Sequence, residues 1–166
     1  FCKAEILPHR LAYISTSGVY GDCHGNLVAE TSRINPTNAR AVRRADAERQ
    51  LRQWGARCGV AVSILRAPGI YASGRLPLER LKAGTPALVR EDDGYTNHIH
   101  AEDLARVAVA ALVRGRPGRV YNVADDSHLK MADYFDLVAD RFGLPRPPRV
   151  TWAEAQGRIP ESLLSF

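Results

Sequence analysis

Residues 11–65 decide the fold, because two β-favouring apolar runs flank a long helical pattern: LAYIST (11–16), ARAVRRADAERQLRQW (39–54) and VAVSIL (60–65). The middle run contains no Gly or Pro, whereas Pro36 stands near its start and Gly55 follows it, as at the two ends of a helix. A strand–helix–strand order with so long a crossover predicts a right-handed βαβ unit. We therefore expect an α/β fold with a parallel sheet.

Later segments continue the alternation of helices and strands. We expect a short helix at 76–83, a strand at 96–100, a helix at 102–114, a strand at 119–124 and an amphipathic helix at 131–142. Gly143 ends the last helix, and the prolines after it predict a stiff connector. Within that helix, helical spacing favours the core over a ligand site for Tyr134, Phe135, Leu137, Val138 and Phe142.

The composition is that of one globular domain. The chain has 166 residues, 45% of them apolar and 25% charged, which excludes collagen-like and disordered classes. Its net charge of +5 comes from scattered basic residues, so we expect no nucleic-acid partner. No apolar run reaches the roughly 20 residues of a spanning helix, and the first residues do not form a secretory signal, so no membrane association is expected. Three cysteines without paired spacing favour a reducing, cytoplasmic location.

A hydroxyl-rich segment, STSGVYGD (15–22), follows the first predicted strand. Ligands bind at the carboxyl ends of strands in open α/β sheets, where one of the three hydroxyls of this segment could donate a hydrogen bond and the Tyr20 phenol could carry a proton. The alternative is that Ser and Gly only make a turn and that Tyr20 packs against its neighbours.

Two histidines alternate on the strand at 96–100 and lie near two acidic residues. His98, His100, Glu102 and Asp103 could form a metal site. We favour a strand-to-helix junction instead, in which a His or Asp side chain binds the first amides of the helix.

Five segments in this order resemble the NAD(P)-dependent epimerase/dehydratase family, the extended short-chain dehydrogenase/reductases. They are STSGVYG (15–21), ETS (30–32) with Asn35-Pro36, ILRAPGIY (64–71), HIHAEDLA (98–105) and VYNVA (120–124). The resemblance implies the later half of a Rossmann-like parallel sheet with elements of a smaller substrate lobe. It also implies NAD or NADP as cofactor and a small hydroxyl or carbonyl substrate, such as a nucleotide sugar. We assign about 1–72 and 96–114 to the nucleotide-binding sheet, and about 73–95 and 115–166 to the substrate side, of a single incomplete domain.

The same resemblance implies roles for individual residues. Thr16 aligns with the family's catalytic Ser or Thr, and Tyr20 is the other hydroxyl near the expected nicotinamide. The residues expected to contact the cofactor are Ser15, Arg44, Pro68, Gly69 and Ile70.

Two departures from the family bear on catalysis. The chain contains no G-x-x-G-x-x-G phosphate loop, so we expect the first half of the nucleotide-binding domain, and with it the residue that selects NAD or NADP, to be missing. Arg40 and Arg44 stand where the family has its Tyr and Lys, and a guanidinium cannot replace a phenol as proton donor.

The resemblance implies an NAD(P)-dependent oxidoreductase, epimerase or dehydratase. Arg40 and Arg44 favour the alternative, a non-catalytic dinucleotide-binding or protein-interaction module on the same scaffold. We expect the 166-residue chain alone to be inactive. We also expect an open sheet edge at Leu11–Thr16, which would favour self-association into a homo-oligomer.

Overall fold

Three parallel strands form the main sheet of the protein. The structure is a computed structural model that describes residues 6–156. The strands lie in the order β1 (Arg10–Thr16), β2 (Ala61–Ala67), β6 (Val120–Asn122). Thr16 is opposite Ala67, and Arg66 is opposite Asn122, so the three strands end at the same edge of the sheet. The expected parallel sheet is confirmed.

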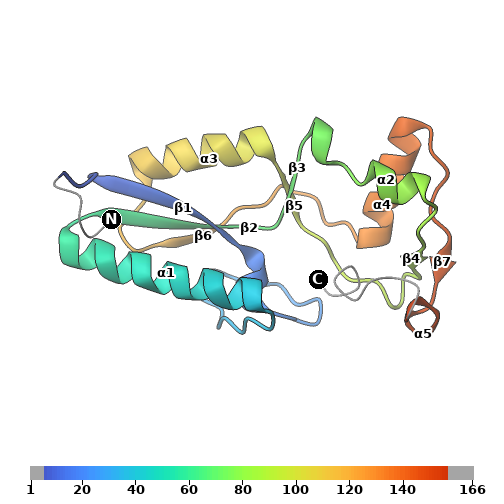
Figure 1. Cartoon of the computed structure of the whole chain (residues 1–166), viewed down its shortest axis with the longest axis horizontal. Helices are drawn as coiled ribbons and strands as arrows, with labels where there is room; N and C mark the ends of the chain where they lie inside the picture. The colour runs from blue at the N-terminus through green and yellow to red at the C-terminus, as the bar shows by residue number, and fades with distance from the viewer. Residues whose placement is uncertain (1–5, 157–166) are drawn as a thin grey trace.

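One helix covers each face of this sheet, and Figure 1 shows the three layers, with α3 (Ala101–Arg114) above the strands and α1 (Ala39–Cys58) below them. The central strand is buried by both helices, because Ile64 packs with Trp54 of α1 and Leu65 packs with Leu104 of α3. The result is the layered α/β architecture of a partial Rossmann-like domain. Within residues 6–156, no helix combines the length and the apolar character that crossing a bilayer requires.

Helix α1 is longer than we expected. Its N-cap Asn38 accepts a hydrogen bond from the Ala41 amide, and the helix ends at Gly59, whose φ of 70° is left-handed. Gly55, which we took as the end of the helix, lies inside it and is buried. A Cβ atom there would lie 2.5 Å from Cγ2 of Val62, so the glycine allows α1 to approach β2 closely.

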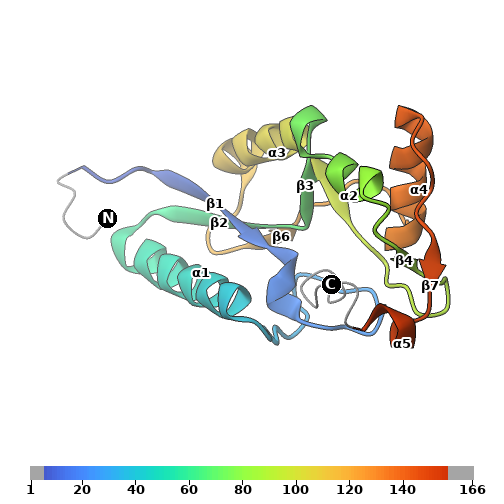
Figure 2. The same cartoon turned by 45° about the vertical axis from the view of Figure 1, so that its right-hand side comes forward.

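A second lobe follows a short parallel pair formed by β3 (Gly69–Tyr71) and β5 (His98–His100). The lobe contains α2 (Leu78–Lys82), β4 (Ala87–Leu88), α4 (Met131–Phe142), β7 (Arg149–Val150) and α5 (Trp152–Ala155). Figure 2 shows these elements grouped apart from β1 and α1. The helices and strands expected from residue 76 onward are present within a few residues of their expected bounds. However, the main sheet takes β6 from the segment that we assigned to the substrate side.

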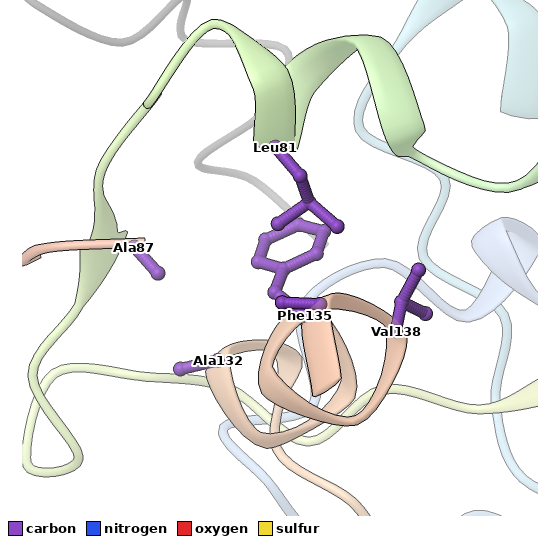
Figure 3. Close-up of a cluster of buried hydrophobic side chains, with 6 residues drawn as sticks. Leu81, Ala87, Ala132, Phe135 and Val138 are labelled. Atoms are coloured by element: carbon purple, nitrogen blue, oxygen red, sulfur yellow. The ribbon is translucent and has the colours of Figure 1, made fainter. Parts of the chain in front are cut away.

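The core of the second lobe forms where α2 and β4 meet α4 (Figure 3). Its buried side chains are Leu81, Ala87, Ala132, Phe135, Val138 and Ala139. The Arg80 guanidinium lies 4.8 Å from the centre of the Phe135 ring. The prediction of a core role is confirmed for Phe135 and Val138 but is wrong for Leu137 and Phe142, which are 58% and 49% exposed. Leu137 lies on the opposite side of α4 from Phe135, and Phe142 is the last residue of the helix.

Candidate functional site

The turn after β1 presents the hydroxyl of Thr16 at the carboxyl edge of the sheet. Thr16 is the N-cap of a 3-10 turn, η1 (Ser17–Tyr20), and its Oγ1 accepts a hydrogen bond from the Gly18 amide at 3.2 Å. The turn is followed by Gly21, where a Cβ atom would lie 2.1 Å from the Asn35 carbonyl oxygen. Because a hydroxyl is both acceptor and donor, this arrangement leaves the Thr16 proton available to a bound oxygen.

Ser15 faces the protein interior rather than the carboxyl edge. Its side chain is buried, and its hydroxyl donates to Oε1 of Glu48 on α1 at 2.5 Å. Successive residues of a strand point to opposite faces, so Ser15 and Thr16 have different surroundings. A direct contact between the Ser15 side chain and a cofactor would require this hydrogen bond to break.

Tyr20 is also in the interior, with 3% of its surface exposed. Its phenol donates to Oδ1 of Asn122 on β6 at 2.6 Å, and the Arg66 guanidinium lies 4.7 Å from the ring centre. Because its hydroxyl proton is engaged in the hydrogen bond to Asn122, this geometry favours the packing alternative over the role of an acid or base.

A buried ion pair between Glu48 and Arg66 connects these residues. Arg66 donates from Nη2 to Glu48 Oε2 at 2.7 Å and from Nε to both carboxylate oxygens at 3.1 and 3.2 Å. Burial favours loss of the Arg66 proton, but hydrogen bonding and attraction to Glu48 outweigh burial and raise the Arg66 pKa. We did not predict this pair. The available signals were an arginine inside an apolar strand and the seven-residue spacing of Ala41, Glu48 and Gly55 on the buried side of α1.

Arg44 reaches the open side of the sheet. Its Nη1 donates to the Tyr13 hydroxyl at 2.9 Å and to the Ile14 carbonyl oxygen at 3.2 Å. Within the described residues, β1 has a strand neighbour on one side only, and Ile14 is 39% exposed, as the expected open edge requires. Arg40, which the sequence register aligns with the family's Tyr, is exposed.

On the other side of the sheet, Oε1 of Glu30 accepts from the Asn122 amide at 3.0 Å. This hydrogen bond holds the pKa of Glu30 below its ordinary value. A polar side chain thus binds the backbone of each outer strand, Arg44 on β1 and Glu30 on β6.

The segment from Pro68 to Ile70 forms the junction between the sheet and the second lobe. A Cβ atom at Gly69 would lie 2.8 Å from Cδ2 of His98, so only glycine allows β3 to run this close to β5. The Gly69 amide donates to the Asn97 carbonyl oxygen at 3.2 Å. Pro68 and Ile70 are each half-buried.

The two histidines of β5 have structural partners. His98 is buried and stacks on Tyr134 of α4 at 4.1 Å between ring centres, and burial lowers its pKa despite the nearby Asp125. His100 caps α3, because its Nδ1 accepts from the Glu102 amide at 3.4 Å. The expected cap is confirmed. Within residues 6–156, no three His, Cys, Asp or Glu side chains are placed to hold a metal ion.

An open cavity of about 610 Å³ lies between α3 and β6. Apolar residues such as Leu65, Val107 and Tyr121 line it, and Asp125 and Asp126 lie at its border. The residues that line it include none of the predicted catalytic or cofactor-binding residues. The structure places these residues differently: Thr16 lies at the carboxyl edge, Ser15 and Tyr20 are buried, and Arg44 lies at the outer strand.

Comparison with known proteins assigns this architecture to a family. The profile of the NAD dependent epimerase/dehydratase family matches residues 2–124, and the chain belongs to that family. A conserved protein of unknown function from Silicibacter pomeroyi has a solved structure with 36% identity and a TM-score of 0.79 over 93% of this chain and 54% of its own.

Curated enzymes also match. The GDP-6-deoxy-D-mannose reductase of Pseudomonas aeruginosa is 28% identical in a match that covers 83% of this chain and 50% of the enzyme. The trifunctional UDP-glucose 4,6-dehydratase, epimerase and reductase RHM2 of Arabidopsis thaliana is 25% identical in a match that covers 86% of this chain and 23% of the enzyme. The chain thus spans about half of the shorter relatives and about a quarter of the trifunctional one.

Proposed function

We propose that this chain supplies the reacting end of an NAD(P)-dependent active site that acts on a hydroxyl or carbonyl group of a small molecule. The observation that carries the proposal is the geometry of Thr16. Its hydroxyl lies at the carboxyl edge of three parallel strands, and its oxygen accepts a hydrogen bond from the Gly18 amide. The hydroxyl can then donate to an oxygen on which negative charge develops during the reaction.

The residues present fit the nicotinamide side of a dinucleotide and not its pyrophosphate side. Thr16 and the backbone around Pro68 and Gly69 lie where strands of the sheet end, whereas the 166 residues contain no glycine-rich phosphate loop. NAD or NADP would supply the hydride chemistry. Arg44 would contact the ribose with donors other than Nη1, which binds the Ile14 carbonyl oxygen.

For the substrate we propose a nucleotide sugar. The support is the family and the printed activities of the relatives, a GDP-sugar reductase and a UDP-sugar dehydratase and reductase. The test is a hydride-transfer assay on the protein together with any residues that precede this chain. NADH and NADPH would be offered separately with UDP-, GDP- and dTDP-4-keto sugars, and oxidation of the cofactor would be measured.

A second candidate is a module that binds the dinucleotide without turning it over. Arg40 and Arg44 stand in place of the family's Tyr and Lys, and the Tyr20 phenol already donates to Asn122. Cofactor binding without oxidation on any of these sugars would favour this candidate over the enzyme.

A further inference from the structure

Both ends of the turn that carries Thr16 are attached to the same buried ion pair. On one side, the Ser15 hydroxyl donates to Glu48 at 2.5 Å. On the other side, the Tyr20 ring lies against the Arg66 guanidinium, 4.7 Å from its centre. Thr16 lies between these two attachments, one residue after Ser15.

The ion pair is a costly way to hold a helix on a sheet. Glu48 and Arg66 expose only 4% and 5% of their side chains, so both charges have lost most of their hydration. Nη1 of Arg66 is also buried, and within the described residues it has no hydrogen-bond partner. Apolar residues of similar volume commonly stabilise such a position equally well or better. Stability alone therefore does not account for the pair, whereas its two attachments to the turn do.

We propose that Glu48 and Arg66 are positioning residues that hold the Thr16 hydroxyl in its reactive orientation. The proposal rests on the proposed function of Thr16. The pair fixes the backbone on both sides of Thr16, which keeps the Gly18 amide on Oγ1 and the hydroxyl proton free for the substrate. Displacement of a reacting group by about 1 Å can lower a rate about 100-fold, so a loosely held turn lowers turnover even when the protein is folded.

The experiment compares the single variants Glu48→Leu and Arg66→Met with the double variant. Each single variant leaves one buried charge without its partner, so the unfolding midpoint falls strongly. The double variant leaves no charge and recovers the wild-type midpoint. The attachments of the turn remain lost in the double variant, and this separates positioning from stability.

Two measurements follow the turn in the double variant. The first is NMR solvent exchange of the Gly18 amide in the chain itself, which we expect to be about 10-fold faster than in the wild type. The Phe135 amide in α4 gives the internal reference, because the second lobe has its own core. The second is kinetics of the active protein, where kcat falls 10- to 100-fold while KM for the cofactor changes less than about 3-fold.

The control variant is Phe135→Leu, which weakens the second lobe without touching the turn and leaves Gly18 exchange unchanged. If the double variant does not fold, Ser15→Ala removes one attachment and leaves the ion pair intact, and Gly18 exchange should rise about 3-fold. Wild-type exchange at Gly18 in the folded double variant or in Ser15→Ala would overturn the proposal, as would faster exchange with unchanged kcat. A wild-type protein that oxidises no cofactor refutes the proposed function, and Gly18 exchange then still decides whether the pair holds the turn.

Discussion

Replacing Tyr20 by Phe distinguishes a packing residue from an acid or base. The variant keeps the ring that lies against Arg66 and removes only the hydroxyl that donates to Asn122 at 2.6 Å. Loss of the donor leaves the Asn122 oxygen without this partner, at a cost of about 1–3 kcal/mol. The Asn122 side-chain amide still donates to the Val28 carbonyl oxygen, and the site is only partly buried, so we expect the lower half of that range.

The assay is urea unfolding of the 166-residue chain, with thermal unfolding as a second measurement. A loss of about 1–2 kcal/mol corresponds to a decrease of roughly 2–8 °C in the melting temperature of a domain of this size. Tyr121→Phe is the matched control, because Tyr121 lies on β6 next to Asn122. Its hydroxyl accepts a hydrogen bond from the exposed Arg116 amide, and water can accept this hydrogen bond in the variant. We expect that control to change stability by less than about 0.5 kcal/mol.

Kinetics of the active protein complete the test. If Tyr20 is a packing residue, turnover of Tyr20→Phe stays within a few-fold of the wild type at a temperature where both are folded. Unchanged stability together with a loss of turnover of 100-fold or more would refute the packing role and identify Tyr20 as the proton carrier.

Three further predictions concern the packing of Gly55, the buried His98 and the binding of the cofactor. Gly55→Ala should lower the free energy of unfolding in urea by about 1–3 kcal/mol, because the new Cβ would lie 2.5 Å from Cγ2 of Val62. Gly74→Ala is the control and should leave the free energy of unfolding unchanged, because a Cβ there would have no atom within 4 Å. Burial holds the pKa of His98 below its value in the unfolded chain, so protonation of His98 favours unfolding. The contribution of His98 to stability is therefore complete above about pH 6.5 and falls as the pH drops below that value. In urea unfolding at several pH values, His98→Phe should flatten this part of the profile. Calorimetry of the chain alone should give a dissociation constant for NADH or NADPH weaker than about 1 μM, because the chain lacks a pyrophosphate loop, and tighter binding would contradict this reasoning.

The elements of the fold could be predicted because local patterns determine them. The apolar runs at 11–16 and 60–65 flank a helical segment without Gly or Pro, and this pattern was enough to predict β1, α1 and β2. The end of α1 could not be predicted in the same way. A glycine after a helical pattern usually ends the helix. Gly55 instead allows α1 to pack closely on Val62, and this tertiary contact cannot be seen in the local sequence.

The site was less predictable, because its contacts join segments that are far apart in the chain. Ser15 and Tyr20 were placed correctly at the end of β1, yet their partners, Glu48 and Asn122, lie 33 and 102 residues away. Arg44 is expected at the cofactor from its register on the helix, and its hydrogen bond to the Ile14 carbonyl oxygen of β1 could not be predicted from that register. Side-chain alternation along β1 does separate Ser15 from Thr16, and this signal could have been used.

The central claim is that Thr16 donates a hydrogen bond to the reacting oxygen, and kcat of Thr16→Val and Thr16→Ser in the active protein tests it most directly. Valine keeps the shape of threonine without the hydroxyl, and serine keeps the hydroxyl. We predict that Thr16→Val lowers kcat about 100-fold or more with cofactor affinity nearly unchanged, and that Thr16→Ser retains kcat within a few-fold. Equal rates for the wild type and Thr16→Val would contradict the assignment of chemistry to this residue.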